Sequence, residues 1–174
     1  MQVLDMVNLS SELFKIETGT FQLKAQPLAL ADILRRIVEL DRVTFASKKL
    51  TISVDLDQPV GAEEPKAMGD PMLCYSLFHN LLRNACEAAP TGTRVSVRLM
   101  DETPLRISLT NHGAVPTAMR ERFFDRFTAG SKPGDSGLGT YSARLLAQAQ
   151  HGDIRLVQND NGNTTTVEVL LQRP

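Results

Sequence analysis

The sequence predicts an α+β protein: an α/β sandwich with helices layered on one face of a mixed, mainly antiparallel sheet. Two observations lead to this prediction. Segments with apolar residues at helical spacing feed segments in which apolar and polar residues alternate, as in strands. Two pairs of strand-like segments are joined by short polar links, which is typical of antiparallel hairpins. At 174 residues without an internal repeat, the chain suits a single main core.

The composition restricts the classes of partner and location. Lysine and arginine total 19 against 20 aspartate and glutamate, which argues against general binding to nucleic acid or to an anionic membrane. No apolar run approaches the ~20 residues that cross a bilayer, and no secretory signal is visible. We therefore expect a cytoplasmic location, and any membrane anchor would lie outside this chain. Cys74 and Cys86 lack the spacing of zinc ligands, so we interpret both as buried thiols.

The N-terminal residues 1–19 predict an amphipathic helix that ends at Gly19. Its apolar stripe begins at once and without a capping residue. We expect this segment to be the end of a longer helix that had a helical partner. An apolar stripe of this kind also predicts a weak homodimer.

The elements that follow are predicted in order from the periodicity and from the helix-breaking residues. Asp70 followed by Pro71 is a typical helix start, and Pro90 ends that helix. Residues 128–137, rich in glycine, serine and proline, predict a loop. The predicted helices cover residues 28–49, 70–89, 117–127 and 137–150, and the predicted strands cover residues 21–26, 50–56, 93–100, 105–111, 152–158 and 164–171.

Asn80 and Asn84 stand four residues apart and therefore share one side of the helix at 70–89. Half-buried amides need partners, and an amide oxygen is a good ligand for a hard cation such as Mg²⁺ that bridges phosphates. The alternative is a polar contact between helices. His79 beside them could accept a proton, but a packed helix residue is the better interpretation.

A second candidate site is the glycine-rich turn around Gly137 and Gly139, at the start of a predicted helix. Free N–H groups and the helix dipole make such a helix start a site for anions. The turn follows a polar loop instead of a strand, so it fits a dinucleotide-binding fingerprint poorly, and the chain contains no GxxxxGK[ST] motif.

Five segments, taken in order, carry a resemblance to a known family. The segments are NLLRNACEAA, TNHGAVP, RFFDRF, GDSGLGTYSARLLAQAQHGDI and GNTTTVEVLL. They resemble the asparagine box, the first glycine box, the phenylalanine box and the second and third glycine boxes of the histidine kinase branch of the gyrase, Hsp90, histidine kinase and MutL ATPases. The resemblance covers about residues 20–172 and implies a Bergerat-type ATPase fold that binds ATP and Mg²⁺.

The resemblance also implies roles for individual residues. Asn84 would bind Mg²⁺, Asn80 would support the phosphate and metal site, and Thr165 would lie near the adenine. The residues implied to hold the phosphates are Gly137, Leu138 and Gly139. A lid over about residues 128–136 would contain Lys132, which would either reach a phosphate or lie solvated in the loop. Phe123, Phe124 and Phe127 would either hinge the lid or simply pack in the core.

The sequence departs from the family pattern in the first glycine box. Asn111 takes the place of an aspartate that accepts a hydrogen bond from adenine, so that bond would be neutral and weaker by roughly half. Gly113 is present, but the second glycine of the box is missing, and Thr164 replaces a glycine of the third box. His112 could contact the base, although a surface turn is the better interpretation.

The resemblance implies a sensor histidine kinase that transfers the γ-phosphoryl of ATP to a histidine on its own dimerisation domain, and from there a response regulator receives it. No histidine lies in residues 1–19, so we expect that segment to be the end of the dimerisation helix and residues 20–174 to be the ATP-binding catalytic domain. Such a fragment would bind ATP without autophosphorylating. The alternatives are a degenerate, non-catalytic signalling module and an ATPase or serine kinase of the same superfamily.

Overall fold

The computed structural model describes residues 11–125 and 139–174. Its centre is a five-stranded sheet in which β2 pairs with β4 in parallel and all other neighbours are antiparallel. In spatial order the strands are β2 (Thr51–Asp57), β4 (Arg94–Met100), β5 (Leu105–His112), β7 (Thr164–Leu171) and β6 (Asp153–Asn159). The predicted mixed, mainly antiparallel sheet is therefore confirmed.

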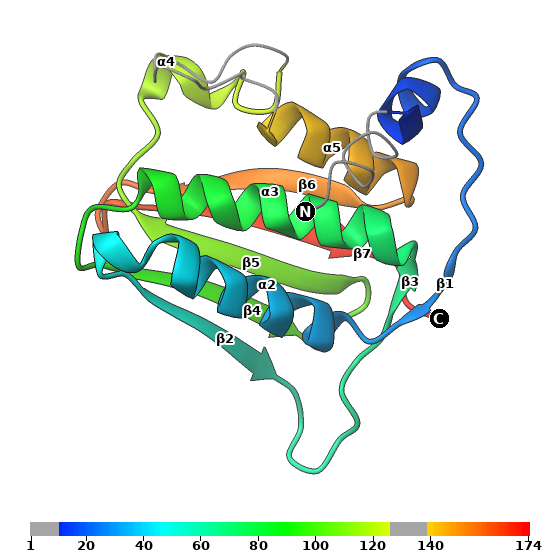
Figure 1. The fold of residues 1–174 in the computed structure, drawn as a ribbon, viewed down its shortest axis with the longest axis horizontal. Coiled ribbons are helices and arrows are strands. Elements are labelled where there is room, and N and C mark those ends of the chain that lie inside the picture. Colours follow the sequence, from blue (N-terminus) through cyan, green and yellow to red (C-terminus); the bar gives the residue numbers. More distant parts are fainter. Residues whose placement is uncertain (1–10, 126–138) are drawn as a thin grey trace.

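Three helices lie over one face of this sheet (Figure 1). They are α2 (Leu30–Thr44), α3 (Pro71–Ala88) and α5 (Gly139–Ala149), and the shorter helices η1 (Ala46–Lys48) and α4 (Thr117–Arg120) lie in the connections. Fully buried side chains from both layers, such as Phe78 and Ile107, form the core between them. The predicted two-layer sandwich is confirmed. Within the described ranges, no helix combines the length and the apolar character needed to cross a membrane.

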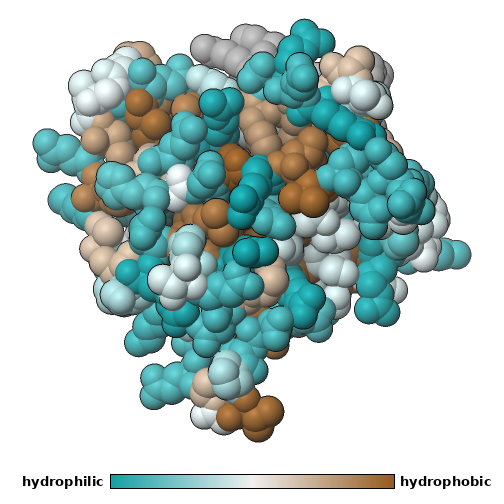
Figure 2. All heavy atoms as spheres, turned by 180° about the vertical axis from the view of Figure 1, so that it is seen from behind, coloured by the Kyte–Doolittle hydropathy of each residue, from teal (hydrophilic) through white to brown (hydrophobic). Residues whose placement is uncertain are grey.

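The face of the sheet away from the helices carries polar side chains. Outward positions of β4 and β5 hold Ser96, Arg98, Ser108 and Thr110, and they line a shallow hollow on this face. Arg98 forms an ion pair with Asp57 across β2 and β4, with an N–O distance of 2.8 Å. Seen from behind, the molecule is mostly hydrophilic with separated hydrophobic spots (Figure 2). The sheet is thus buried on one face only, as is common for antiparallel sheets.

Helix α3 begins and ends where the sequence predicts. The carboxylate of Asp70 accepts the N–H of Leu73 at 3.0 Å and so caps the first turn. At the other end, the ammonium group of Lys48 donates to the carbonyls of Cys86 and Glu87 at 2.8 and 2.9 Å. These carbonyls have no partner within a helix that is ending, so Lys48 stabilises the end of α3.

Two predicted elements need correction. The strand expected at residues 21–26 is absent there; instead β1 (Gln26–Leu28) pairs with β3 (Ala67–Gly69) in a separate two-stranded sheet. Such short strands are too brief for alternation to reveal, and Pro27 is tolerated because this sheet has only edge strands. The helix expected at 117–127 is also shorter, since α4 ends at Arg120 and turns follow to residue 125.

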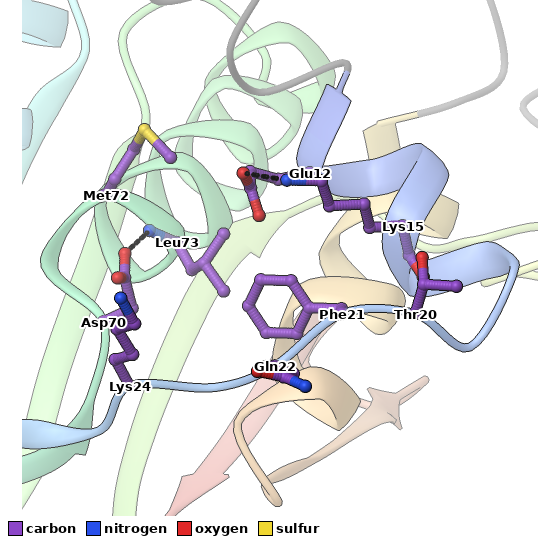
Figure 3. A pocket seen from close by; sticks show the side chains of 9 residues that line it. All are labelled: Glu12, Lys15, Thr20, Phe21, Gln22, Lys24, Asp70, Met72 and Leu73. Atoms are coloured by element: carbon purple, nitrogen blue, oxygen red, sulfur yellow. Dashed lines mark hydrogen bonds and ion pairs between the residues drawn. The ribbon is translucent and has the colours of Figure 1, made fainter.

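The N-terminal part that is described lies against the start of α3. Residues 11–17 are helical, and Gly19 has a φ of 75°, in agreement with the predicted glycine at the helix end. Between this helix, the chain after it and α3 lies a hollow of about 460 Å³, in which Phe21 and Leu73 are apolar lining residues (Figure 3). The predicted boundary at residue 19 stays a prediction, and residues 1–10 lie outside the described ranges.

Both cysteines are buried, as predicted. Burial raises the pKa of the Cys74 and Cys86 thiols to about 12, so both stay protonated at neutral pH. They therefore act as apolar core residues of α3.

A buried carboxylate lies between α2 and α3. Asp41 is 1% exposed, and its Oδ2 has no hydrogen-bond partner among the described residues. Burial raises the pKa of Asp41 from 3.8 to about 6, although the nearby Arg83 opposes this shift. The folded state therefore holds the proton more tightly than the unfolded chain. The carboxylate costs stability as pH rises from about 4 to above 6, by roughly 3 kcal/mol at most.

We expect Asp41→Asn to stabilise the domain at pH 8 by about 1–2 kcal/mol, because it removes the buried charge but leaves an amide to satisfy. At pH 4 the gain should largely vanish, since Asp41 is then protonated. Urea unfolding at both pH values measures the difference. Asp55→Asn, at an exposed position on β2, is the control and should change the free energy of unfolding by the same amount at both pH values. An equal effect of Asp41→Asn at pH 4 and pH 8 would contradict this account.

Candidate functional site

The structure brings Asn84 of α3 against the first residue of α5. Asn80 and Asn84 are half-buried, whereas the neighbouring Leu77 and Leu81 face the core. A Cβ placed on Gly139 would lie 3.1 Å from Nδ2 and 3.2 Å from Oδ1 of Asn84. The backbone at the start of α5 therefore lies so close to the Asn84 amide that a side chain at position 139 would crowd it.

This arrangement suits phosphates and a hard cation. α5 is an 11-residue helix that begins at Gly139, so the positive end of its dipole lies beside Asn84. The Asn84 amide supplies an oxygen ligand beside it. Among the described residues, no group of three or more His, Cys, Asp or Glu side chains could hold a metal ion. A cation at this place would therefore depend on amide and phosphate oxygens together. Lys132, Gly137 and Leu138 lie outside the described residues.

A second group of predicted residues meets at one end of the sheet. Asn111 on β5 pairs directly with Thr165 on β7, and Thr165 pairs with Gln158 on β6. Asn111 is 7% exposed and Thr165 is 5% exposed, so both polar side chains lie in the helix-covered layer. A few polar groups that converge among apolar neighbours are typical of a ligand site, so this row is a candidate for ligand contact.

The turn after β5 is held in place by hydrogen bonds. Gly113 has a φ of 106°, a conformation that favours glycine, and its N–H donates to the carbonyl of Asn163 at 2.8 Å. The Thr165 hydroxyl donates to the carbonyl of Gly113 at 2.7 Å. A Cβ on Gly113 would lie 3.8 Å from the carbonyl oxygen of Ala88, so the turn lies beside the end of α3. The first and third glycine-box segments thus meet next to the asparagine-bearing helix.

Asn111 presents a defined end of its amide. Its Nδ2 donates to the carbonyl of His112 at 2.8 Å, which leaves Oδ1 as the acceptor for a ligand. His112 is exposed at the end of β5, in agreement with the surface interpretation. His79 stacks on Tyr75 with ring centroids 5.8 Å apart, and burial lowers its pKa. A neutral, stacked His79 agrees with the packed-residue interpretation.

The described phenylalanines link α4 to the start of α5. Phe123 and Phe124 form an edge-to-face pair with centroids 4.9 Å apart and pack against the core. The Thr140 hydroxyl donates to the carbonyl of Phe123 at 2.7 Å. The core-packing interpretation therefore holds for both rings, and the bond to Thr140 adds a tie to the start of α5. Phe127 and the lid expected at 128–136 lie outside the described residues.

We expect Gly139→Ala to weaken magnesium-dependent nucleotide binding by about tenfold, because a displaced ligand set typically costs this much. The new Cβ would push the Asn84 amide by a few tenths of an ångström. Calorimetric titration measures the affinity, and thermal melting checks that the fold persists. Ala149→Ser, at the far end of α5, is a control for a small change within the same helix. Unchanged affinity in Gly139→Ala would show that this contact does not matter for binding.

Sequence reasoning missed two residues of this region. Gln158 accepts the N–H of Val115 at 3.1 Å, and Arg120 donates to the carbonyl of Val115 at 2.9 Å while pairing with Asp160 at 2.6 Å. A signal for Gln158 was available: Ile154, Leu156 and Gln158 share the inward positions of one strand, so a glutamine stands where an apolar residue is expected. Arg120 had no such signal, because its ion-pair partner Asp160 lies 40 positions away in the sequence.

Comparison with known families and proteins gives consistent results. The family model described as histidine kinase-, DNA gyrase B-, and HSP90-like ATPase matches residues 69–174. The adaptive-response sensory kinase SasA of Synechocystis sp. is 29% identical over 140 residues, which are 77% of this chain and 36% of that protein. The swarming motility regulation sensor protein RssA of Serratia marcescens is 31% identical over 159 residues, 88% of this chain and 32% of that protein. The chain thus spans about a third of these relatives.

Solved structures show the same fold. Full-length ShkA in complex with AMPPNP superposes with a TM-score of 0.77 at 19% identity, over 99% of this chain and 37% of that one. The mycobacterial sensor histidine kinase MprB gives a TM-score of 0.71 at 24% identity, over 88% of this chain and 99% of that one. The sandwich described above is therefore an established architecture.

Proposed function

Because this chain belongs to the family of histidine kinase-, DNA gyrase B- and HSP90-like ATPases, we propose that residues 20–174 are the ATP-binding catalytic domain of a two-component sensor histidine kinase. The observation that carries the proposal is the contact between Asn84 and the start of α5 at Gly139. It supports the proposal because an amide oxygen, which can bind a hard cation, lies beside a helix start, which can bind phosphates. Matches to curated sensor kinases support the same assignment.

The proposed roles follow from these positions. The N–H groups at the start of α5, with Gly137, Leu138 and Gly139, would hold the phosphates, and Lys132 would add a point charge. Asn84 would hold Mg²⁺, and Asn80 would support it from one turn earlier in α3. The base would lie against Asn111, Gly113 and Thr165. When bound, Mg²⁺ supplies positive charge that offsets the charge of the phosphates.

Catalysis by such a domain would consist of positioning and charge stabilisation, as for phosphoryl transfer in general. The acceptor would be a histidine on the protein's own dimerisation domain, of which residues 1–19 would be the end. His79 is stacked and poorly placed as the acceptor, since its side chain is engaged with Tyr75. A response regulator would then receive the phosphoryl group. A weak homodimer through residues 1–19 remains part of this proposal.

The test has two steps. Calorimetric titration with a non-hydrolysable ATP analogue should show binding that strengthens with Mg²⁺. Incubation with ATP and a separately supplied dimerisation domain should then place phosphate on a histidine of that domain, in acid-labile form. Magnesium-dependent binding without transfer would show that the domain binds ATP and would contradict the proposed kinase role.

A second candidate is a degenerate, non-catalytic signalling module with the same fold. It is favoured by Asn111, whose amide lacks the charge that strengthens a hydrogen bond to a base, and by the missing second glycine in the first glycine box. Absence of binding at millimolar nucleotide would support this alternative over the kinase.

A further inference from the structure

Gln158 is the third member of the polar row that crosses β5, β7 and β6. Asn111, Thr165 and Gln158 occupy directly paired positions on these neighbouring strands. Elsewhere the inward positions of the same strands are apolar, as at Leu109, Val167 and Leu156. The sequence resemblance assigns no role to Gln158, although it touches the same groups as the predicted base-binding residues.

Both ends of the Gln158 amide are engaged. Its Nε2 donates to the carbonyl of Thr164 at 2.7 Å. Its Oε1 accepts the N–H of Val115 at 3.1 Å and lies 3.3 Å from the Thr165 hydroxyl. Turning the amide over would place its NH₂ group against the N–H of Val115 and its oxygen against the carbonyl of Thr164. The orientation of Gln158 is therefore fixed by its surroundings.

These contacts fix the groups that a base would meet. The single proton of the Thr165 hydroxyl lies between the Gly113 carbonyl and Gln158, so Gln158 helps to determine where that hydroxyl points. The bond to Val115 holds the other end of the Gly113 turn. Asn111, at the β5 end of the row, keeps its Nδ2 on the His112 carbonyl and offers only its oxygen to a ligand.

We infer that Gln158 is a positioning residue for nucleobase recognition: through Thr165 and the Gly113 turn it sets how strongly the Asn111 site prefers a purine with a 6-amino group over one with a 6-oxo group. A 6-amino group can donate to the fixed Asn111 oxygen, whereas a 6-oxo group would place one acceptor against another. Gln158 acts through Thr165 and the Gly113 turn and does not itself touch the base. This inference rests on the proposed function.

The experiment compares magnesium-dependent binding of the imidodiphosphate analogues of ATP and ITP. The unaltered domain should bind the adenine nucleotide about tenfold more tightly, the usual worth of one hydrogen bond. In Gln158→Leu, which is similar in size but cannot hydrogen-bond, the preference should fall to about twofold, mainly through weaker binding of the adenine nucleotide. Gln172→Leu is the matched control, since Gln172 also donates to a backbone carbonyl but lies near the C-terminus.

The outcomes separate the inference from the proposed function. Binding of neither nucleotide by the unaltered domain would overturn both. Equal affinities in the unaltered domain, an unchanged preference in Gln158→Leu, or an equal loss for both nucleotides with a lower melting temperature would overturn the inference alone. If Gln158→Leu does not fold, Gln158→Glu serves instead. Glutamate keeps an acceptor for the N–H of Val115 and loses the donor to the carbonyl of Thr164. We therefore expect a preference for the adenine nucleotide between about twofold and about tenfold, and a preference equal to that of the unaltered domain contradicts the inference.

Discussion

Replacement of Asn84 by alanine should abolish the magnesium-dependent part of nucleotide binding, with a loss of affinity of at least about 100-fold. The Asn84 amide supplies the atoms nearest to a Cβ on Gly139, the first residue of α5, so the variant removes the oxygen ligand at that point. Calorimetry with the ATP analogue, with and without Mg²⁺, measures the change. Without Mg²⁺ the variant and the unaltered domain should bind alike, because the loss concerns the metal ligand.

Two further variants make this result interpretable. Asn161→Ala alters an exposed asparagine of the β6–β7 turn and should leave binding intact. Asn84→Asp keeps an oxygen ligand, so it should retain a response to Mg²⁺ even if the added charge weakens phosphate binding. Full magnesium-dependent binding by Asn84→Ala would contradict the proposed role of this residue as a metal ligand.

The largest loss of stability should come from Gly152→Ala, about 3 kcal/mol, at the connection between α5 and β6. A Cβ at this position would lie 2.5 Å from the carbonyl oxygen of Leu170 and 3.2 Å from that of Ala147. Both contacts are with backbone, and Leu170 is held in β7 by its pairing with β6. Neither can move away as a flexible side chain could, so the strand or the helix must shift.

Urea unfolding measures this loss, and the thermal midpoint should fall by about 10 °C for a domain of this size. Gly162→Ala is a suitable control, because its Cβ would meet the end of the exposed Asn159 side chain at 2.9 Å. That side chain can rotate, so the control should cost under about 1 kcal/mol. Equal losses in the two variants would show that backbone crowding at Gly152 is not the cause.

The regular elements of the sandwich could be predicted because their signals are local. The alternation of residues 105–111 and 164–171 depends only on neighbouring positions, and both strands formed within one residue of the prediction. Asp70 and Pro90 marked the limits of α3 in the same way. The short strands β1 and β3 were not predicted, because a strand of three residues is defined by its pairing partner and is too short to show a pattern.

The sequence by itself determined the fold class, the family and the residue types of the candidate site, since periodicity and ordered motifs are properties of the chain. Tertiary structure alone decided which of these residues meet. The contact of Asn84 with Gly139 joins two helices, and the register of β6 against β7 places Gln158 beside Thr165. The orientation of the Asn111 amide likewise depends on where the His112 carbonyl lies. These hydrogen bonds and close contacts form only when the strands pair and the helices pack on the sheet, so no local pattern in the sequence predicts them.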